Sequence, residues 1–304
     1  MSMLRKRGRV LLAAASVCLV GVCAWFILSR AEPEPSYQGK PLTFWLAAFD
    51  SGNWNPGHPN GPPAPSYEEA VHAFREMGTN GLPYLLRLIQ KPHSRFTSLL
   101  GRAAVSLHLG KLQYSLFNSA NERYSAASAV QAVGPGASNA VPELLQIYDR
   151  NPRSAFLQQF IPGFLGSIGP PAQSALPMLL KATTHTNQLV RQNAIYALGM
   201  IGESPEVVVP VLARLLNDSS PSVQAYAAHS LGLYGTNAIA TVSALKALWS
   251  NSPPAAGRGV YLGFGTSWGV DWNSSLGLTA DVRSEVRNAL ESISPDDAAK
   301  VGSR

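Results

Sequence analysis

The chain has 304 residues, of which 46% are hydrophobic and only 14% are charged, and this balance excludes a disordered or acidic-tail protein. Its 26 glycines and 23 prolines are ordinary for the length, which excludes collagen-like and low-complexity classes. The net charge is +6, but five of the 24 cations stand in residues 1–30, where no acid occurs: Arg5, Lys6, Arg7, Arg9 and Arg30. The rest of the chain is nearly neutral, so we expect no nucleic acid among its partners.

Residues 10–28 form an uncharged, apolar run that predicts a transmembrane helix. As an α-helix the run would span about 28 Å, close to the roughly 30 Å thickness of the hydrocarbon core. Four cations precede it, so the positive-inside rule places residues 1–9 in the cytoplasm as a short tip and the rest of the chain outside the cell membrane. We therefore expect a single-pass signal anchor, followed by a linker over residues 29–41. A cleaved signal peptide, which would leave the protein secreted, and a buried helix are the alternatives.

An internal repeat governs residues 42–304. Its clearest feature is a set of recurring glycines: Gly78, Gly134, Gly169, Gly202 and Gly235. The last three intervals between them are 35, 33 and 33 residues. Apolar residues stand one, four and eight positions before each glycine, which places them on one face of an α-helix. Four positions before, for example, are Phe74, Val130, Leu165, Leu198 and Leu231. We expect each glycine to end a first helix in a bend.

A second helix is expected after each bend. Three prolines stand eight residues after their glycines, where proline suits a first helical turn: Pro142, Pro177 and Pro210. In the first unit, Pro83 stands five residues after its glycine. Leucines recur two residues further on, also in the fifth unit: Leu85, Leu144, Leu179, Leu212 and Leu245. Ser66, three residues before Glu69, is a capping-box pattern that starts the first of these units.

A partial sixth unit repeats the register near the C-terminus, with Val282, Val286, Ala289, Leu290 and Ile293. One helix pair cannot bury its apolar face alone, so the array is the folding unit. The sequence therefore predicts an all-α protein, in which residues 42–304 form an α-solenoid of stacked antiparallel helix pairs behind the transmembrane helix.

These residues resemble HEAT repeats in the short, alanine-rich form that also occurs in phycobilisome-lyase-type proteins. The motif is clearest in Val190, Arg191, Ala194, Ala197, Leu198, Ile201, Gly202, Pro210 and Leu212. The segment from Tyr37 to Leu46 also looks like the opening of membrane-anchored bacterial HEAT-repeat proteins. The resemblance implies a binding scaffold, and it implies bonds within or between repeats for three arginines that share one register position: Arg123, Arg191 and Arg283.

Two insertions interrupt the period. The first, at about residues 92–121, contains an apolar stretch that predicts an extra helix. The second, at about 251–278, interleaves glycines with aromatic residues: Tyr261, Phe264, Trp268 and Trp272. Insertions in repeat proteins map to loops, often on a binding face, so these four residues are candidates for partner binding. The alternative is that they only cover the apolar face of the last repeat.

Motifs for catalysis are weak throughout the chain. The segment from Gly265 through Ser267 to Gly269 matches the pattern of a hydrolase nucleophile, but that pattern requires a sheet and a downstream histidine. The last histidine, His229, precedes Ser267 and is expected to pack inside a first helix. We therefore expect no catalytic, cofactor-binding or metal-binding residues, and predict that the protein is not an enzyme.

The predicted function is a membrane-tethered, non-enzymatic HEAT-repeat scaffold that binds another protein, or a saccharide, outside the cytoplasmic membrane. The row of second helices, the aromatic insertion, or both would provide the binding surface. A self-associating structural protein of the envelope is the alternative. A third possibility is a lyase-like or chaperone-like role, as the resemblance to lyase-type repeats implies.

Overall fold

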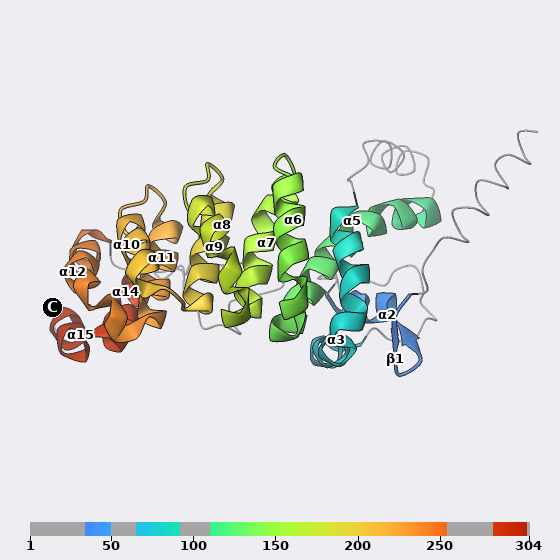
Figure 1. The fold of residues 1–304 in the computed structure, drawn as a ribbon, viewed down its shortest axis with the longest axis horizontal. Helices are drawn as coiled ribbons and strands as arrows, with labels where there is room; N and C mark the ends of the chain where they lie inside the picture. The colour runs from blue at the N-terminus through green and yellow to red at the C-terminus, as the bar shows by residue number, and fades with distance from the viewer. Residues whose placement is uncertain (1–33, 50–64, 92–109, 254–281, 303–304) are drawn as a thin grey trace, which may run out of the picture. The chain divides into compact units, whose positions relative to one another are not determined.

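The computed structural model describes residues 34–49, 65–91, 110–253 and 282–302. These residues form helices joined by short loops, apart from one short hairpin (Figure 1), which largely confirms the all-α prediction. Within the described ranges, no helix combines the length and the apolar character needed to cross a membrane. The predicted anchor, residues 10–28, lies outside these ranges.

The hairpin is a departure from the prediction of a plain linker over residues 29–41. Strands β1 (Ser36–Tyr37) and β2 (Lys40–Pro41) pair antiparallel. Gln38 and Gly39 connect them, both with positive φ, as a tight two-residue hairpin turn requires. Helix α2 (Leu42–Leu46) and the 3₁₀ turn η1 (Ala47–Phe49) follow directly and pack against the first repeat.

Each repeat is built from a first and a second helix. The first helices are the part of α3 (Tyr67–Gln90) before its glycine, α5 (Gly110–Val133), α7 (Ala155–Ile168), α9 (Gln188–Ile201), α11 (Pro221–Leu233) and α14 (Val282–Ile293). The second helices are the rest of α3, α6 (Val141–Arg150), α8 (Leu176–Ala182), α10 (Pro205–Leu215), α12 (Val242–Asn251) and α15 (Pro295–Gly302). Short 3₁₀ segments join three of the pairs: η2 (Gly134–Ala140), η3 (Pro170–Ala175) and η4 (Gly235–Thr241).

The repeats stack in chain order (Figure 1). Each first helix packs against the first helix of the next repeat, and α6, α8, α10 and α12 each pack against the first helix of the repeat that follows. This arrangement confirms the predicted solenoid of helix pairs. The capping box at the start of α3 is also confirmed, because the Ser66 hydroxyl accepts from the Glu69 amide and the Glu69 carboxylate accepts from the Ser66 amide.

The bends occur where the glycines predict them. All five repeat glycines have positive φ, between 46° and 76°, a conformation that a residue with a side chain adopts only at a cost. Pro142 and Pro177 stand in the first turns of α6 and α8, as expected. The expectation for Pro210 is wrong, because α10 begins five residues earlier at Pro205.

The early start of α10 has a local cause. No 3₁₀ segment follows Gly202; instead Ser204 adopts a left-handed conformation and Pro205 takes the first helical position. The Tyr234 hydroxyl stabilises this tight bend, since it lies within hydrogen-bond distance, 3.0 Å, of the carbonyl oxygens of both Leu198 and Glu203. Pro83 likewise lies inside α3 rather than at a helix start.

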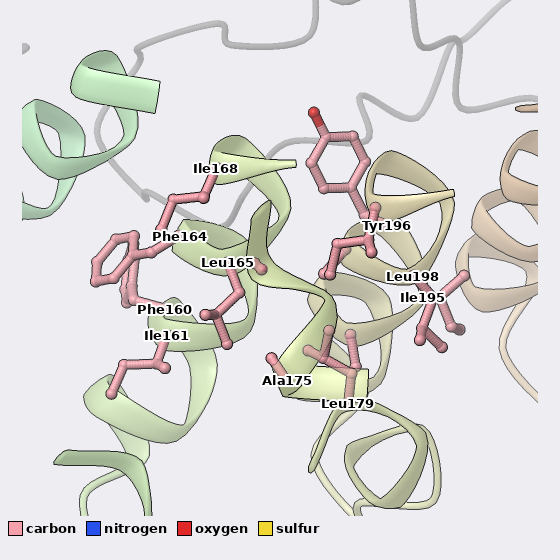
Figure 2. Close-up of a cluster of buried hydrophobic side chains, with 14 of the residues drawn as sticks. Phe160, Ile161, Phe164, Leu165, Ile168, Ala175, Leu179, Ile195, Tyr196 and Leu198 are labelled. Atoms are coloured by element: carbon pink, nitrogen blue, oxygen red, sulfur yellow. The ribbon is translucent and has the colours of Figure 1, made fainter. Parts of the chain in front are cut away.

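The predicted core register is confirmed. The five aligned leucines of the second helices are fully buried: Leu85, Leu144, Leu179, Leu212 and Leu245. The stripe of apolar residues on the first helices is buried as well, and so are the five apolar residues of the sixth unit. Figure 2 shows this arrangement in the third and fourth repeats, where side chains of α7, α8 and α9 such as Leu165, Leu179 and Leu198 fill the space between the helices.

A second set of glycines sets the distance between first helices. Gly166, Gly199 and Gly232 recur every 33 residues, three positions before the bend glycines. A Cβ atom at Gly166 would lie 2.9 Å from the Cα of Ala197, closer than real side chains approach, and one at Gly232 would lie 3.0 Å from the Cα of Ala289. Successive first helices therefore meet backbone to backbone at Gly166 and Gly232, whereas Gly199 lies against the Ser230 side chain.

The two predicted insertions have different outcomes. Residues 110–121 form the first part of α5, so this part of the first insertion lengthens a first helix. The apolar stretch that predicts an extra helix lies in residues 92–109, so that expectation stays a prediction. Residues 92–109 and 254–281 lie outside the described ranges.

Candidate interaction surface

The second helices carry an ordered row of cations. The second helices of the first four repeats each have a basic residue in the last turn, one each in α3, α6, α8 and α10. The terminal helix α15 has Lys300 in its last turn, but this side chain lies 3.6 Å from the Asp297 carboxylate. We call Arg87, Arg150, Lys181 and Arg214 the cationic row; all four are exposed. A cation in the last turn of a helix also interacts favourably with the partial negative charge of the helix C-terminus.

The register explains why these side chains face outward. Lys181 and Arg214 each follow a buried core leucine by two residues, which is about 200° around the helix and therefore points away from the core. Arg87 stands at the same position. Arg150 lies one turn beyond the equivalent position, which Gln146 occupies, and so shares the same face.

Exposed prolines accompany the cations. Each of Pro83, Pro142, Pro177 and Pro210 lies on the same face as the cation of its helix, toward the bend. A proline inside a helix leaves one carbonyl without an amide partner, and an exposed face lets water satisfy it. Each second helix of the first four repeats therefore presents a pyrrolidine ring and, one or two turns further, a positive charge.

Three of the four cations of the row are not neutralised within the described part of the chain. Arg150, Lys181 and Arg214 make no salt bridge with the residues described in the structure. The guanidinium of Arg87 lies 5.6 Å from the centre of the Tyr84 ring, in a cation–π arrangement.

The three arginines at a shared position of the first helices have a different role. The Nε of Arg123 donates to the Ile89 carbonyl at 2.7 Å, and its guanidinium stacks 3.8 Å from the Phe156 ring. Arg191 donates to the carbonyls of the preceding loop and forms a 3.0 Å ion pair with Asp218 in the next one. The Arg283 guanidinium lies over the Trp249 ring. The expectation that these arginines join repeats is confirmed.

A partly buried polar pair connects the last two first helices, α11 and α14. His229, on α11, lies with its Nδ1 3.1 Å from the carboxylate of Glu285 on α14. The Glu285 side chain is 1% exposed, and the pair confirms that His229 packs within the solenoid. Burial raises the pKa of the nearby Tyr226 hydroxyl well above its usual range, and Tyr196 and Glu285 add to that shift. The sequence analysis missed Glu285, because it identified only the apolar positions of α14.

An aromatic cluster between α5 and α7 was also missed. Tyr124 contacts Phe156 and Phe160 edge-on, at centroid distances of 5.1 and 5.8 Å, and the two phenylalanines stack at 4.5 Å. Tyr124 is 37% exposed, so the cluster reaches the surface. Figure 2 shows Phe160 and Phe164 together on the side of α7 that faces away from α9.

The residues predicted for partner binding, Tyr261, Phe264, Trp268 and Trp272, lie outside the described ranges. The same is true of the Gly265–Gly269 motif. Among the residues that the structure describes, no group of three or more His, Cys, Asp or Glu side chains could hold a metal ion.

Comparison with known proteins agrees with the repeat geometry. Residues 177–261 match a family model described as HEAT repeats. No curated protein matches the chain. The match begins in α8 and includes the pairs α9–α10 and α11–α12, and the bends and buried leucines continue with the same register in the repeats before it. Residues 177–261 therefore carry HEAT repeats, and together with the shared register they support the HEAT-repeat family for the solenoid as a whole.

Proposed function

We propose that the protein is a non-enzymatic scaffold that binds another protein through the exposed face of its second helices. HEAT-repeat solenoids generally serve protein–protein interaction, because stacked repeats provide a long continuous surface. The observation that carries the proposal is the cationic row, in which four successive repeats present a cation on the same exposed face, three of them at the same register position. Buried leucines behind each position hold these helices in place, so the surface is preorganised for binding.

We further propose that residues 10–28 tether this scaffold to the cell membrane, with residues 1–9 in the cytoplasm and the solenoid outside. The uncharged run and the four cations before it support the tether and its direction. A tether raises the effective concentration of the solenoid toward partners at the same membrane. Fusion of alkaline phosphatase, which is active only after export, to the C-terminus checks the orientation. An inactive fusion that remains membrane-bound would contradict it.

A site-specific crosslinking experiment tests the scaffold itself. A photoactivatable residue replaces Gln146, in the middle of the exposed face, and in a control variant it replaces Asn288, which is exposed on the terminal first helix. After irradiation of intact cells, mass spectrometry identifies what is attached. A foreign protein captured at position 146 and not at 288 is the expected result.

Other outcomes of the same experiment would overturn the proposal. Crosslinks only to further copies of this chain would favour a self-associating envelope protein. A chromophore bound to the purified chain would favour a lyase-like role instead.

The aromatic insertion is a second proposed contact, from the sequence alone. Replacing both Trp268 and Trp272 with alanine should weaken capture of the partner without lowering the melting temperature. A large drop in melting temperature would instead show that these residues cover the last repeat.

A further inference from the structure

We propose that the cationic row binds an extended acidic segment of the partner polypeptide, with an acidic side chain at about every third residue. This inference rests on the proposed function, because it names the chemistry of the partner at that same surface. It follows from the sign, the spacing and the width of the row.

The sign of the charge favours an anionic ligand at one end of the second helices. Glu143 and Glu206 are exposed on α6 and α10, but they stand in the first turns of these helices. Arg150 and Arg214 stand in the last turns, which places about 10 Å between acid and cation along each helix. Asp149 is exposed beside Arg150 in the last turn of α6, so ligand carboxylates would meet cations before acids at the other three positions of the row.

The spacing favours an extended chain. Packed helices lie about 10 Å apart, and the row has one cation per repeat. An extended polypeptide advances about 3.3 Å per residue, so three residues span one repeat. Acidic residues at every third position would face successive cations, with a shift of one helical turn at Arg150.

The width of the row disfavours a nucleic acid. A DNA duplex carries one charge per roughly 1.7 Å, many times the density of a single file of cations about 10 Å apart. The pyrrolidine rings beside the cations, such as Pro177 next to Lys181, would instead contact the apolar parts of a polypeptide.

Two peptides of identical composition provide the test. One is capped, fluorescent (Glu-Gly-Ser)₄, and the other has its four glutamates in one block followed by the Gly-Ser residues. Binding to the full chain in detergent is measured by fluorescence anisotropy at low ionic strength, where surface charges are least screened. We expect the evenly spaced peptide to bind at least about 3-fold more tightly than the block peptide, given the few-fold contribution of each exposed ion pair.

Charge reversal identifies the residues responsible. The triple variant Arg150→Glu, Lys181→Glu, Arg214→Glu should weaken binding of the spaced peptide about 10-fold or more. The control variant Arg153→Glu, Arg287→Glu, Lys300→Glu makes the same change in net charge at exposed positions outside the row and should change binding less than about 2-fold. Circular dichroism verifies that both variants remain helical, and restoring lysine at the three positions of the row should restore binding.

Several results would overturn the inference. The first is equal binding of the two peptides, and the second is an equal loss of peptide binding in the triple variant and the control variant. The third is competition by vesicles of phosphatidylglycerol, or by single-stranded DNA, that is as strong as competition by the unlabelled spaced peptide. The proposed function fails separately: if the crosslinker at position 146 captures a foreign protein equally well in the triple variant, only the acidic ligand is wrong. If it captures none in the natural chain, the scaffold proposal is wrong.

Discussion

Replacing Gly166 with alanine should separate two repeats that the fold holds in backbone contact. The new Cβ would lie 2.9 Å from the Cα of Ala197, 3.2 Å from its Cβ and 3.2 Å from a ring carbon of Tyr196. The first of these atoms belongs to the backbone of α9, so relief of the clash requires a shift of the whole helix. Overpacking of this kind costs about 1–3 kcal/mol, and a backbone clash belongs at the upper end of that range.

Helix propensity works in the opposite direction. Alanine stabilises a helix interior by about 1 kcal/mol relative to glycine, so the expected net loss in the free energy of unfolding is about 2 kcal/mol. A matched control is Gly81→Ala in α3. Its new Cβ would lie 3.4 Å from Leu42 Cδ1 and 3.5 Å from Met77 Cβ, which are ordinary contacts. This variant should be neutral or more stable by up to about 1 kcal/mol.

Urea unfolding followed by circular dichroism measures both variants, and hydrogen exchange of α7 and α9 locates the effect. Because repeats are stabilised mainly by their neighbours, a weakened contact between α7 and α9 should also broaden the transition. If Gly166→Ala proved as stable as Gly81→Ala, the close approach of first helices would not be a requirement of this fold.

Three further predictions concern the core, the buried hydroxyls and the loop ion pair. Leu212→Ala should cost about 2–5 kcal/mol in urea unfolding, because Leu212 is fully buried, and a loss below about 0.5 kcal/mol would refute the core register. Burial raises the pKa of Tyr196 to about 12 and that of Tyr226 higher still, while an unfolded tyrosine titrates near pH 10. The unfolded chain therefore releases protons that the folded chain retains, so the contribution of these tyrosines to stability should be constant below about pH 10 and fall from there through pH 12. Tyr226→Phe should reduce this slope, and an unchanged slope would show that Tyr226 does not contribute to it. Replacing Arg191 with methionine removes its ion pair with Asp218 and its hydrogen bonds to two carbonyls, and should lower the free energy of unfolding by about 2–3 kcal/mol. A loss no larger than that of Arg153→Met, measured in the same way, would show that Arg191 does not stabilise the two loops that it connects.

Features that depend on a few neighbouring residues could be predicted from the sequence. The bends at Gly169 and Gly202 follow from the steric freedom of glycine, and the capping box at Ser66 follows from a pair three residues apart. The burial of Leu179 and Leu212 follows from helical periodicity alone. The cations of the second helices were visible in the sequence too, but their alignment as a row required the stacking of the repeats.

Contacts between distant residues were decided only by the tertiary structure. Gly166 and Gly199 are ordinary helix residues until the next first helix lies against them, and their 33-residue spacing was the one signal that could have identified them. The pairing of His229 with Glu285 joins residues 56 positions apart. Local rules act over one or two helical turns, whereas these contacts depend on how closely and in which rotation successive repeats pack, and that is settled by the fit of whole helices.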